Sequence, residues 1–428
     1  DFADTLTGGG GDERFQGGAG NDGIDGAAGT DTADYFIDFD TNGDGLGVIV
    51  NLSTSQTSTS KAGVTYNVAA GTALDGAGGT DTLANIENVA GSIYDDLIVG
   101  SSVTNVLNGG RGSDSLVGGA GNDTLDGGVA GPDYYFDWVS YRGASSAVNV
   151  NLGTGTATGD SSVDNDTLFN IDGVSGSNLG DVLTGGSNSQ WFNGTKYEWF
   201  QGNGGNDTID GGRGTSDPMN ASNFEFNIAQ YSSAGSGVTV NLSLGTATGD
   251  VSVGNDTLID INFVIGSASN DTLIGGNPLF DYSEAFQGSG GDDSIDGGSG
   301  TDYVGYRNST SGVNVNFATG SALDGLGSTD TLTSIEGVSA SDYADTLIGG
   351  SGNDIFLGYA GNDSIDGAGG TDTARYSSDS DANGDGLGVI VNLSTSQISA
   401  SKAGVTYNVA AGTALDAWGG TDTLTSIE

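Results

Sequence analysis

Aspartate recurs in this chain at steps of nine residues, each time at the end of a short glycine-rich stretch. Segments such as NDTIDGGRG (206–214) and DDSIDGGSG (292–300) follow the pattern G-G-x-G-x-D-x-U-x, where U is an apolar residue. A carboxylate beside a tight glycine turn brings side-chain and backbone oxygens together, and calcium takes six to eight such oxygens. The spacing therefore indicates the binding of hard cations at many places along the chain.

The remaining composition narrows the chemistry further. The chain has 428 residues, of which 80 are Gly, and 56 acidic residues against nine basic ones give a formal charge of −47. Such a chain repels nucleic acid and anionic lipid, so we expect no nucleic-acid partner and no membrane insertion. Cys and His do not occur in the sequence, which excludes thiolate and histidine metal centres and the Ser-His-Asp arrangement.

We also expect the protein not to be an enzyme. Paired carboxylates can hydrolyse glycosides, but nearly all the acids lie in the repeat, where cation binding explains their positions. Glu198, Glu225 and Glu284 are the acids that lie in irregular inserts, and the three lysines form no Schiff-base or phosphate constellation.

Each nonapeptide predicts its own local structure. Gly at the first, second and fourth places supplies the positive φ angles that a tight turn requires. The x-U-x triplet is a minimal strand with one inward side chain, as at Phe15, Ile24, Leu116, Leu125, Ile209, Ile295, Phe356 and Ile365. Because low hydrophobicity with high charge favours disorder, we expect the chain to unfold when cations are withheld.

The nonapeptides resemble those of the RTX (repeats-in-toxin) calcium-binding proteins. The resemblance covers nearly the whole chain and is strongest in clusters near residues 3–34, 96–128, 181–214, 271–305 and 345–375. It implies an all-β fold, a parallel β-roll or β-helix solenoid with calcium-binding turns, that takes up multiple Ca²⁺ ions. It also implies secretion and a location outside the cell or at its surface.

In such a roll, turns 18 residues apart stack on the same side. This pairs Asp4 with Asp22, Glu13 with Asp31, Asp345 with Asp363, and Asp354 with Asp372. The candidate metal ligands in these and related turns are Asp4, Glu13, Asp22, Asp31, Asp81, Asp96, Asp114, Asp123, Asp207, Asp271, Asp293, Asp302, Asp330, Asp345, Asp354, Asp363, Asp372 and Asp422.

A second motif, D-x-D-x-N-G-D-G, occurs at 38–45 and at 379–386. It matches the first half of an EF-hand loop but lacks the closing Glu, so it predicts a calcium-binding loop on the side of the roll or a plain polar loop. Its candidate ligands are Asp38, Asp40, Asn42, Asp44, Asp379, Asp381, Asn383 and Asp385.

The segments between the clusters repeat as well. Each holds an alternating strand such as AVNVNL (147–152) and then a turn such as GLGSTDTL (325–332). We therefore expect further coils of one continuous solenoid, in units 1–92, 93–177, 178–267, 268–341 and 342–428, the last truncated. Residues 42–75 and 383–416 are nearly identical, which predicts a longer tandem array with protein abutting both ends.

The function that fits best is a calcium-stabilised extracellular structural rod, such as an adhesin stalk, surface layer, sheath or filament component. The alternative is the calcium-binding module of a secreted enzyme or toxin whose active domain lies outside this chain. We expect self-association or contact with neighbouring repeats of the same polypeptide. Aromatic inserts at 132–138, 190–200, 223–226 and 279–286 either cap interrupted coils, contact a neighbouring rod or bind glycan.

Overall fold

The computed structural model describes ten segments of the chain: residues 2–37, 46–61, 64–128, 135–186, 191–192, 195–212, 224–276, 283–376, 388–402 and 405–428. The regular structure of these residues consists of the short strands β1 to β45, which confirms the all-β prediction. A helix of the length and apolarity that a membrane span needs was not found among the described residues.

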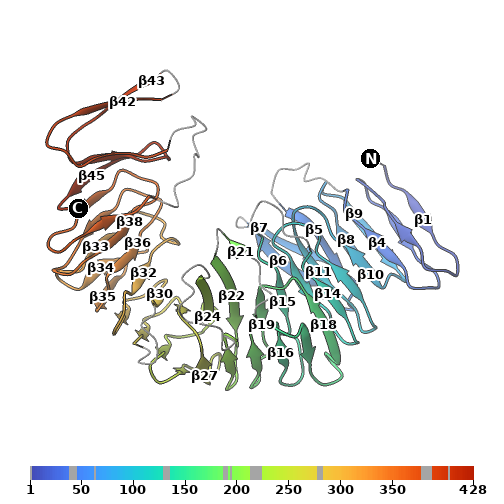
Figure 1. The fold of residues 1–428 in the computed structure, drawn as a ribbon. Helices are drawn as coiled ribbons and strands as arrows, with labels where there is room; N and C mark the ends of the chain where they lie inside the picture. The colour runs from blue at the N-terminus through green and yellow to red at the C-terminus, as the bar shows by residue number, and fades with distance from the viewer. Residues whose placement is uncertain are drawn as a thin grey trace. The chain divides into compact units, whose positions relative to one another are not determined.

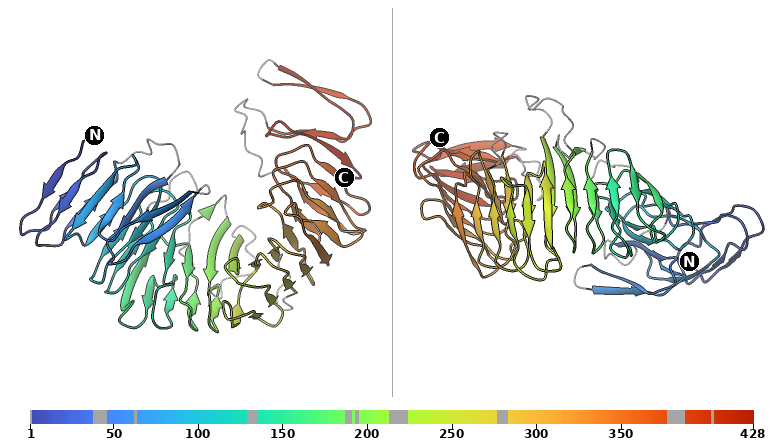
Figure 2. Two further views of the ribbon diagram at one scale, coloured as in Figure 1. Left: turned by 180° about the vertical axis from the view of Figure 1, so that it is seen from behind. Right: turned by 90° about the horizontal axis from the view of Figure 1, so that it is seen from below.

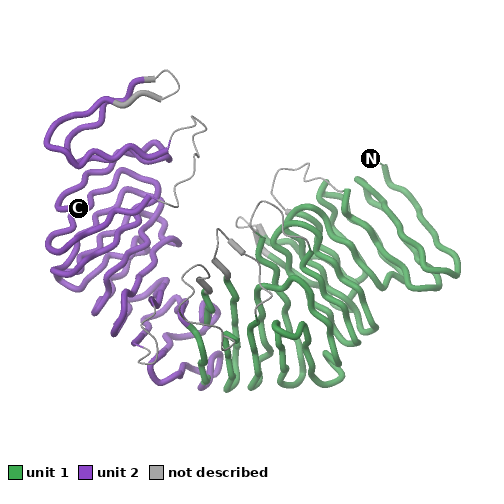
Figure 3. The backbone as a smooth tube through the Cα atoms, in the orientation of Figure 1, with its two compact units in different colours: residues 1–229, 256–261 green, residues 230–255, 262–428 purple. Residues whose placement is uncertain are grey.

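The chain forms two compact units (Figure 3). Unit 1 comprises residues 1–229 and 256–261, and unit 2 comprises residues 230–255 and 262–428. Within each unit, strands stack rung upon rung, as Figure 1 shows from the front and Figure 2 from behind and below. We describe each unit by itself.

Parallel pairing with a step of 18 residues builds the coils. In unit 1, Leu6 of β1 (Thr5–Thr7) pairs with Ile24 of β3 (Gly23–Asp25). In unit 2, Leu347 of β37 (Thr346–Ile348) pairs with Ile365 of β39 (Ser364–Asp366). Two nonapeptides therefore make one coil, and the chain passes through two faces of a β-roll in turn.

The strands of unit 1 fall into two parallel faces and a few antiparallel additions. One face holds β1, β3, β5 (Leu46–Asn51), β9 (Thr80–Ala84), β11 (Asp95–Val99), β13 (Ser115–Val117), β15 (Trp138–Ser140), β19 (Gly173–Ser175), β22 (Thr195–Gln201) and β24 (Phe224–Gln230). The other holds β2 (Arg14–Phe15), β4 (Thr32–Asp34), β10 (Asn88–Ala90), β12 (Val106–Asn108), β14 (Thr124–Asp126), β16 (Asn149–Asn151), β18 (Asn165–Phe169), β20 (Val182–Thr184), β23 (Thr208–Asp210) and β27 (Asn255–Ile259). The antiparallel strands are β6 (Thr57–Lys61), β7 (Val64–Val68), β8 (Thr72–Leu74), β17 (Thr156–Thr158) and β21 (Trp191–Phe192).

Unit 2 repeats this plan. One face holds β28 (Phe263–Ile265), β30 (Ala285–Gln287), β32 (Tyr303–Gly305), β36 (Gly337–Ser339), β38 (Ile355–Leu357) and β40 (Thr373–Ala374). The other holds β25 (Thr239–Asn241), β29 (Thr272–Ile274), β31 (Ser294–Asp296), β33 (Asn314–Asn316), β35 (Thr329–Thr333), β37, β39 and β45 (Thr421–Thr425). The antiparallel strands are β26 (Thr246–Thr248), β34 (Ser321–Leu323), β41 (Ile390–Asn392), β42 (Ile398–Lys402), β43 (Val405–Val409) and β44 (Thr413–Leu415).

The segments between the clusters differ from the plain coils that the sequence suggested. In unit 2, β33, β34 and β35 form an antiparallel meander, and β35 then pairs in parallel with β31. Gly320, with φ of 66°, makes the turn between β33 and β34. The alternating strand therefore returns to the roll through an antiparallel excursion, which lengthens that coil from 18 residues to the 37 that separate Ser294 from its partner Thr331.

Most of the three-residue strands place one side chain in the interior of the roll. Central residues such as Leu107, Leu125 and Leu347 are fully buried, while the residues on either side of them point outward. Large side chains enter where the sequence has Phe at the central place, as at Phe286 and Phe356. Because each coil buries only a thin apolar core, contacts between successive turns must supply much of the cohesion.

Candidate metal-binding turns

The acidic residues at the ends of the turns stack into columns, which we call acid ladders. In the rungs the backbone N–H of one residue donates to a carboxylate oxygen of the acidic residue in the next rung, most often Oδ1 of an aspartate. All the pairs predicted from the 18-residue step stand in this relation, with N···O distances of 2.8 to 2.9 Å: Asp4 to Asp22, Glu13 to Asp31, Asp345 to Asp363, and Asp354 to Asp372.

The second carboxylate oxygen distinguishes one class of rung. In nine aspartates of the described ladders, Oδ2 is buried without a hydrogen-bond partner, although each residue is at most 2% exposed. We call the turns that these residues end the open turns; their aspartates are Asp22, Asp31, Asp114, Asp123, Asp207, Asp293, Asp302, Asp363 and Asp372. Buried anionic oxygens rarely remain unpartnered, so these atoms point to a bound cation.

The first glycine of an open turn leaves no space for a side chain. A Cβ added to Gly358, the first residue of its turn, would lie 2.2 Å from Oδ2 of Asp363, and one added to Gly288 would lie 2.0 Å from Oδ2 of Asp293. A Cβ on Gly367 would meet both Oδ2 of Asp372, at 2.5 Å, and the carbonyl oxygen of Ser426, at 2.1 Å. Carboxylate and carbonyl oxygens therefore converge in the open turns.

Burial makes the ionised form of several of these carboxylates unfavourable. It raises the pKa of Asp207, Asp293 and Asp363 to about 8, and repulsion by neighbouring aspartates adds to the effect in each of the three. Burial likewise raises the pKa of Asp302 to about 7. A divalent cation would remove this penalty by compensating the charge.

The donor set fits calcium. An open turn offers an unpartnered carboxylate oxygen with backbone carbonyl oxygens of stacked turns, and hard oxygen donors of this kind suit Ca²⁺. Across the described residues, no three acidic side chains gather into a metal cluster made of side chains alone. Backbone carbonyls would therefore complete the coordination in the open turns.

The other predicted ligands lie in rungs whose oxygens are already hydrogen-bonded. Oδ2 of Asp96, Asp271 and Asp345 accepts the backbone N–H of a serine four residues earlier, and Oδ1 accepts that serine's hydroxyl. In a second group, Oδ2 accepts a tyrosine hydroxyl, from Tyr35 to Asp81, from Tyr306 to Asp330 and from Tyr376 to Asp422. In a third group the donor is a glycine N–H, from Gly9 to Glu13 and from Gly350 to Asp354.

The candidate ligands of the two EF-hand-like motifs lie outside the described residues; they are Asp38, Asp40, Asn42, Asp44, Asp379, Asp381, Asn383 and Asp385. Among the candidates of the repeat, Asp4 stands at the exposed start of its ladder.

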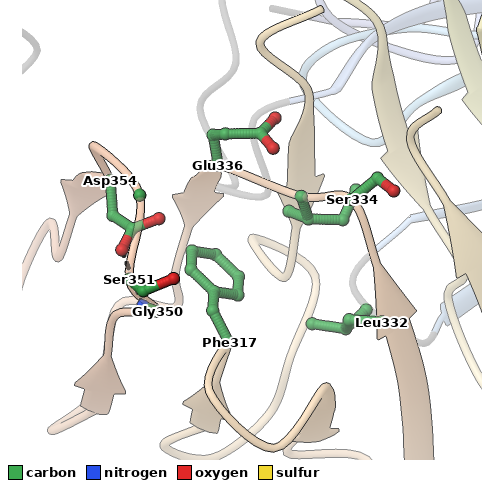
Figure 4. Close-up of a pocket in the computed structure, with 9 residues that line it drawn as sticks. Phe317, Leu332, Ser334, Glu336, Gly350, Ser351 and Asp354 are labelled. Carbon is green, nitrogen blue, oxygen red and sulfur yellow. Dashed lines mark hydrogen bonds between the residues drawn. The ribbon is translucent and has the colours of Figure 1, made fainter. Parts of the chain in front are cut away.

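The turn of Asp354 borders a cavity of about 160 Å³ (Figure 4). Asp354 and Glu336 line it together with Phe317 and the turn residues Gly350 and Ser351. Glu336 belongs to the neighbouring rung, where its carboxylate accepts the N–H of Asp302 at 3.0 Å. The cavity is thus part of the ladder.

Sequence reasoning missed several residues that shape the ladders. Glu198 and Glu284 were assigned to irregular inserts, but the carboxylate of Glu198 accepts the N–H of Gly186, and that of Glu284 accepts the N–H of Gly276. Glu284 also donates its own N–H to Asp302, so it is a rung of a ladder. A serine at the second place of a turn together with a side chain at the fourth place, as in GSNLGD (176–181), was the signal for the serine-bonded rungs and for the unpredicted Asp181.

The described aromatic residues of the inserts pack mainly on one another. In unit 1 the ring of Trp138 lies 5.9 Å from that of Trp199, and the ring of Tyr197 lies 5.3 Å from that of Phe226. Gly173 stands between Trp138 and Trp199 in the sheet register, and a Cβ there would lie 2.6 Å from the Trp138 ring. This arrangement matches local packing over the sheet, one of the alternatives that the sequence left open.

These observations define a calcium-binding parallel β-roll. A comparison with protein families matches the RTX calcium-binding nonapeptide repeat (4 copies) over residues 1–33, 99–129, 198–215, 259–277, 280–305 and 339–374. The matched residues are therefore RTX calcium-binding nonapeptide repeats, whose turns bind multiple Ca²⁺ ions. A search of curated proteins returned no match to the chain.

Proposed function

We propose that this protein is a structural rod that calcium stiffens outside the cell, as part of an adhesin stalk, surface layer, sheath or filament. The observation that carries this proposal is the distribution of the open turns. Their unpartnered oxygens recur along the ladders of both units, from Asp22 to Asp372. Sites spread in this way serve cohesion between coils, whereas an enzyme concentrates its reactive groups in one cavity.

The physical role of the ions follows from the charge. The chain carries a formal charge of −47, and the open turns bury carboxylates whose pKa values are raised to as much as about 10, at Asp114, chiefly by burial. Without cations, stacked carboxylates repel one another and the glycine-rich backbone gains entropy on unfolding. Calcium bound in the turns offsets both effects, so a secreted chain would fold where calcium is abundant.

The calcium-binding module of a secreted enzyme or toxin remains the second candidate, because it would use the same turns. The full polypeptide distinguishes the two, since only the module stands beside a catalytic or toxic domain. Self-association and glycan binding belong to the first candidate as proposals. We propose no catalytic activity for the chain itself.

A calcium titration tests the proposed function. We expect the β signal in far-ultraviolet circular dichroism to disappear largely in chelator and to return with calcium, and the scattering profile to change from that of a flexible coil to that of a stiff particle. Magnesium at equal concentration should not replace calcium, because it requires stricter octahedral geometry. A β signal and a scattering profile that calcium leaves unchanged would contradict the proposal.

A further inference from the structure

Among the described turns that end in aspartate, four are closed by serine, with nearly the same geometry in each. Oδ2 of the aspartate accepts the serine N–H at 2.6 to 3.0 Å, and Oδ1 accepts the serine hydroxyl at 2.6 to 2.8 Å. The pairs are Ser92 with Asp96, Ser177 with Asp181, Ser267 with Asp271, and Ser341 with Asp345. Each serine is at most 1% exposed. The serine thus occupies the space beside the carboxylate and satisfies both of its oxygens.

Backbone conformation separates the serine-closed turns from the open ones. In the nine open turns the second residue has φ between 62° and 105°, and the fourth is always a glycine with φ between 111° and 147°. In the serine-closed turns neither residue has a positive φ. The fourth residue there is Tyr94, Leu179, Ser269 or Tyr343, and its N–H donates to the serine hydroxyl oxygen at 3.0 to 3.1 Å.

Serine alone does not close a turn. Ser289 holds the second place in the turn of Asp293, yet its φ is 77° and Oδ2 of Asp293 has no partner. The fourth residue of that turn is Gly291, with φ of 111°. A glycine at the fourth place permits the open conformation, and a side chain there favours the closed one.

Each serine-closed turn holds the start of an antiparallel excursion. Oδ1 of Asp345 accepts the N–H of Val313, which precedes β33, at 2.8 Å, and Oδ1 of Asp271 accepts the N–H of Val238, which precedes β25, at 2.7 Å. In unit 2 a second hydrogen bond holds the excursion of β33 and β34: the hydroxyl of Tyr306 donates to Asp330 at 2.9 Å.

The residues 306–348 are therefore hydrogen-bonded to one another along much of their length. In the turn after β34, Oδ1 of Asp324 accepts the N–H groups of Leu326, Gly327 and Ser328, while its buried Oδ2 has no partner. Within residues 306–348, β33 pairs with β34 and β37, and β34 pairs with β35. In unit 1, residues 141–184 show the same arrangement: Tyr141 donates to Asp166, Val148 donates to Asp181, and β16 pairs with β17 and β20. We call these two stretches the hairpin segments.

We propose that the hairpin segments are metal-independent parts of the roll, in which serine and tyrosine hydroxyls replace calcium, and that calcium controls only the nonapeptide coils between them. This inference rests on the proposed function and refines it. Chelation would leave folded segments joined by unfolded nonapeptides, so calcium would switch the chain between a stiff roll and a flexible string of segments. In this proposal Asp96, Asp271 and Asp345 are hydrogen-bonding residues, and calcium belongs to the open turns.

Hydrogen exchange of the full chain tests the proposal. Calcium at 100 times its dissociation constant protects about 100-fold, so peptides from 288–300 and 358–370 should exchange about 100-fold faster in chelator. Peptides from 313–324 and 329–345 should keep most of their protection. An equal loss of exchange protection in the nonapeptide peptides and in the hairpin peptides would overturn the inference and leave calcium stabilisation intact. Loss in neither set would overturn the inference and the proposed function together.

A designed turn gives a second, independent test. Ser267→Gly combined with Ser269→Gly changes residues 266–271 to GGAGND, the text of the open turns at 17–22 and 118–123. We expect the variant to bind one additional calcium ion per chain, and the protection of the Val238 amide to become calcium-dependent. Ala268→Gly, which adds a glycine but keeps both serines, should change neither quantity. A folded double variant with unchanged calcium content would overturn the proposal.

Discussion

Replacing Asp293 by Asn removes the negative charge of an open turn but keeps nearly the same side-chain shape. Oδ1 of Asp293 accepts the N–H of Asp271 at 2.8 Å, and an amide oxygen can keep that bond. Oδ2, buried and unpartnered beside Gly288, becomes an NH₂ group that cannot bind a cation. The substitution therefore removes one calcium ligand while it preserves the ladder.

Whether Asp293→Asn lowers or raises the free energy of unfolding should depend on calcium. Removing one member of a buried charge pair costs about 3–5 kcal/mol, which corresponds to about 100- to 4,000-fold in the calcium affinity of that turn. In chelator the effect should reverse or vanish. Burial raises the pKa of Asp293 to about 8, with repulsion from Asp330 and Asp271 in addition, so above that pH the wild-type turn buries an unfavourable charge that the variant lacks.

The assay compares the wild type with the variant above pH 8, by urea unfolding in calcium and by the residual β circular dichroism in chelator, where the nonapeptide coils are expected to be largely unfolded. Equilibrium dialysis counts the bound calcium. Asp292→Asn is the matched control, because Asp292 is exposed and its Oδ1, which accepts the N–H of Thr329, is retained as an amide oxygen. We expect Asp293→Asn to lose about one ion and to be destabilised in calcium only. Equal destabilisation in both conditions with an unchanged calcium count would refute the reasoning.

Three further predictions concern the same ladders. In chelator, the free energy of unfolding should be highest below about pH 4 and should fall as the pH rises through 7 and 8. The reason is that burial raises the pKa of Asp302 to about 7 and that of Asp363 to about 8, while unfolded aspartate titrates near 3.9. Urea unfolding measured against pH checks this trend, and the opposite trend would contradict it. Gly358→Ala should abolish binding in its turn, since the Cβ would lie 2.2 Å from Oδ2 of Asp363, and calcium dialysis that finds no lost ion would disprove it. Tyr306→Phe should destabilise the protein by about 1–3 kcal/mol in calcium and in chelator alike. Tyr343→Phe, at a tyrosine that is half-exposed, is the control in the same unfolding assay. An effect of Tyr306→Phe that depends on calcium would contradict the prediction.

The local part of this architecture could be predicted from sequence, because it depends on residues close together in the chain. The turn glycines and the step of 18 residues were enough to pair Asp345 with Asp363. The excursions were harder to foresee, since the contact from Tyr306 to Asp330 spans 24 residues that lack a fixed period.

The division of turns into two classes could not be predicted from residue type at one place. Ser267 and Ser289 both hold the second place of a turn, yet only Ser267 donates to the carboxylate. The difference depends on the fourth place, where Ser269 and Gly291 require different backbone conformations. The carboxylates that lie in closed rungs looked, in sequence, the same as those in open ones.

The position of bound calcium tests the central claim most directly. A crystal grown in calcium, measured for the anomalous signal of the ion, locates every site without reference to the ladders. We predict ions beside Oδ2 of the open-turn aspartates, such as Asp207, Asp293 and Asp363, bridging to carbonyl oxygens of stacked turns. Turns of this kind without bound ions in a calcium-saturated crystal would contradict the account.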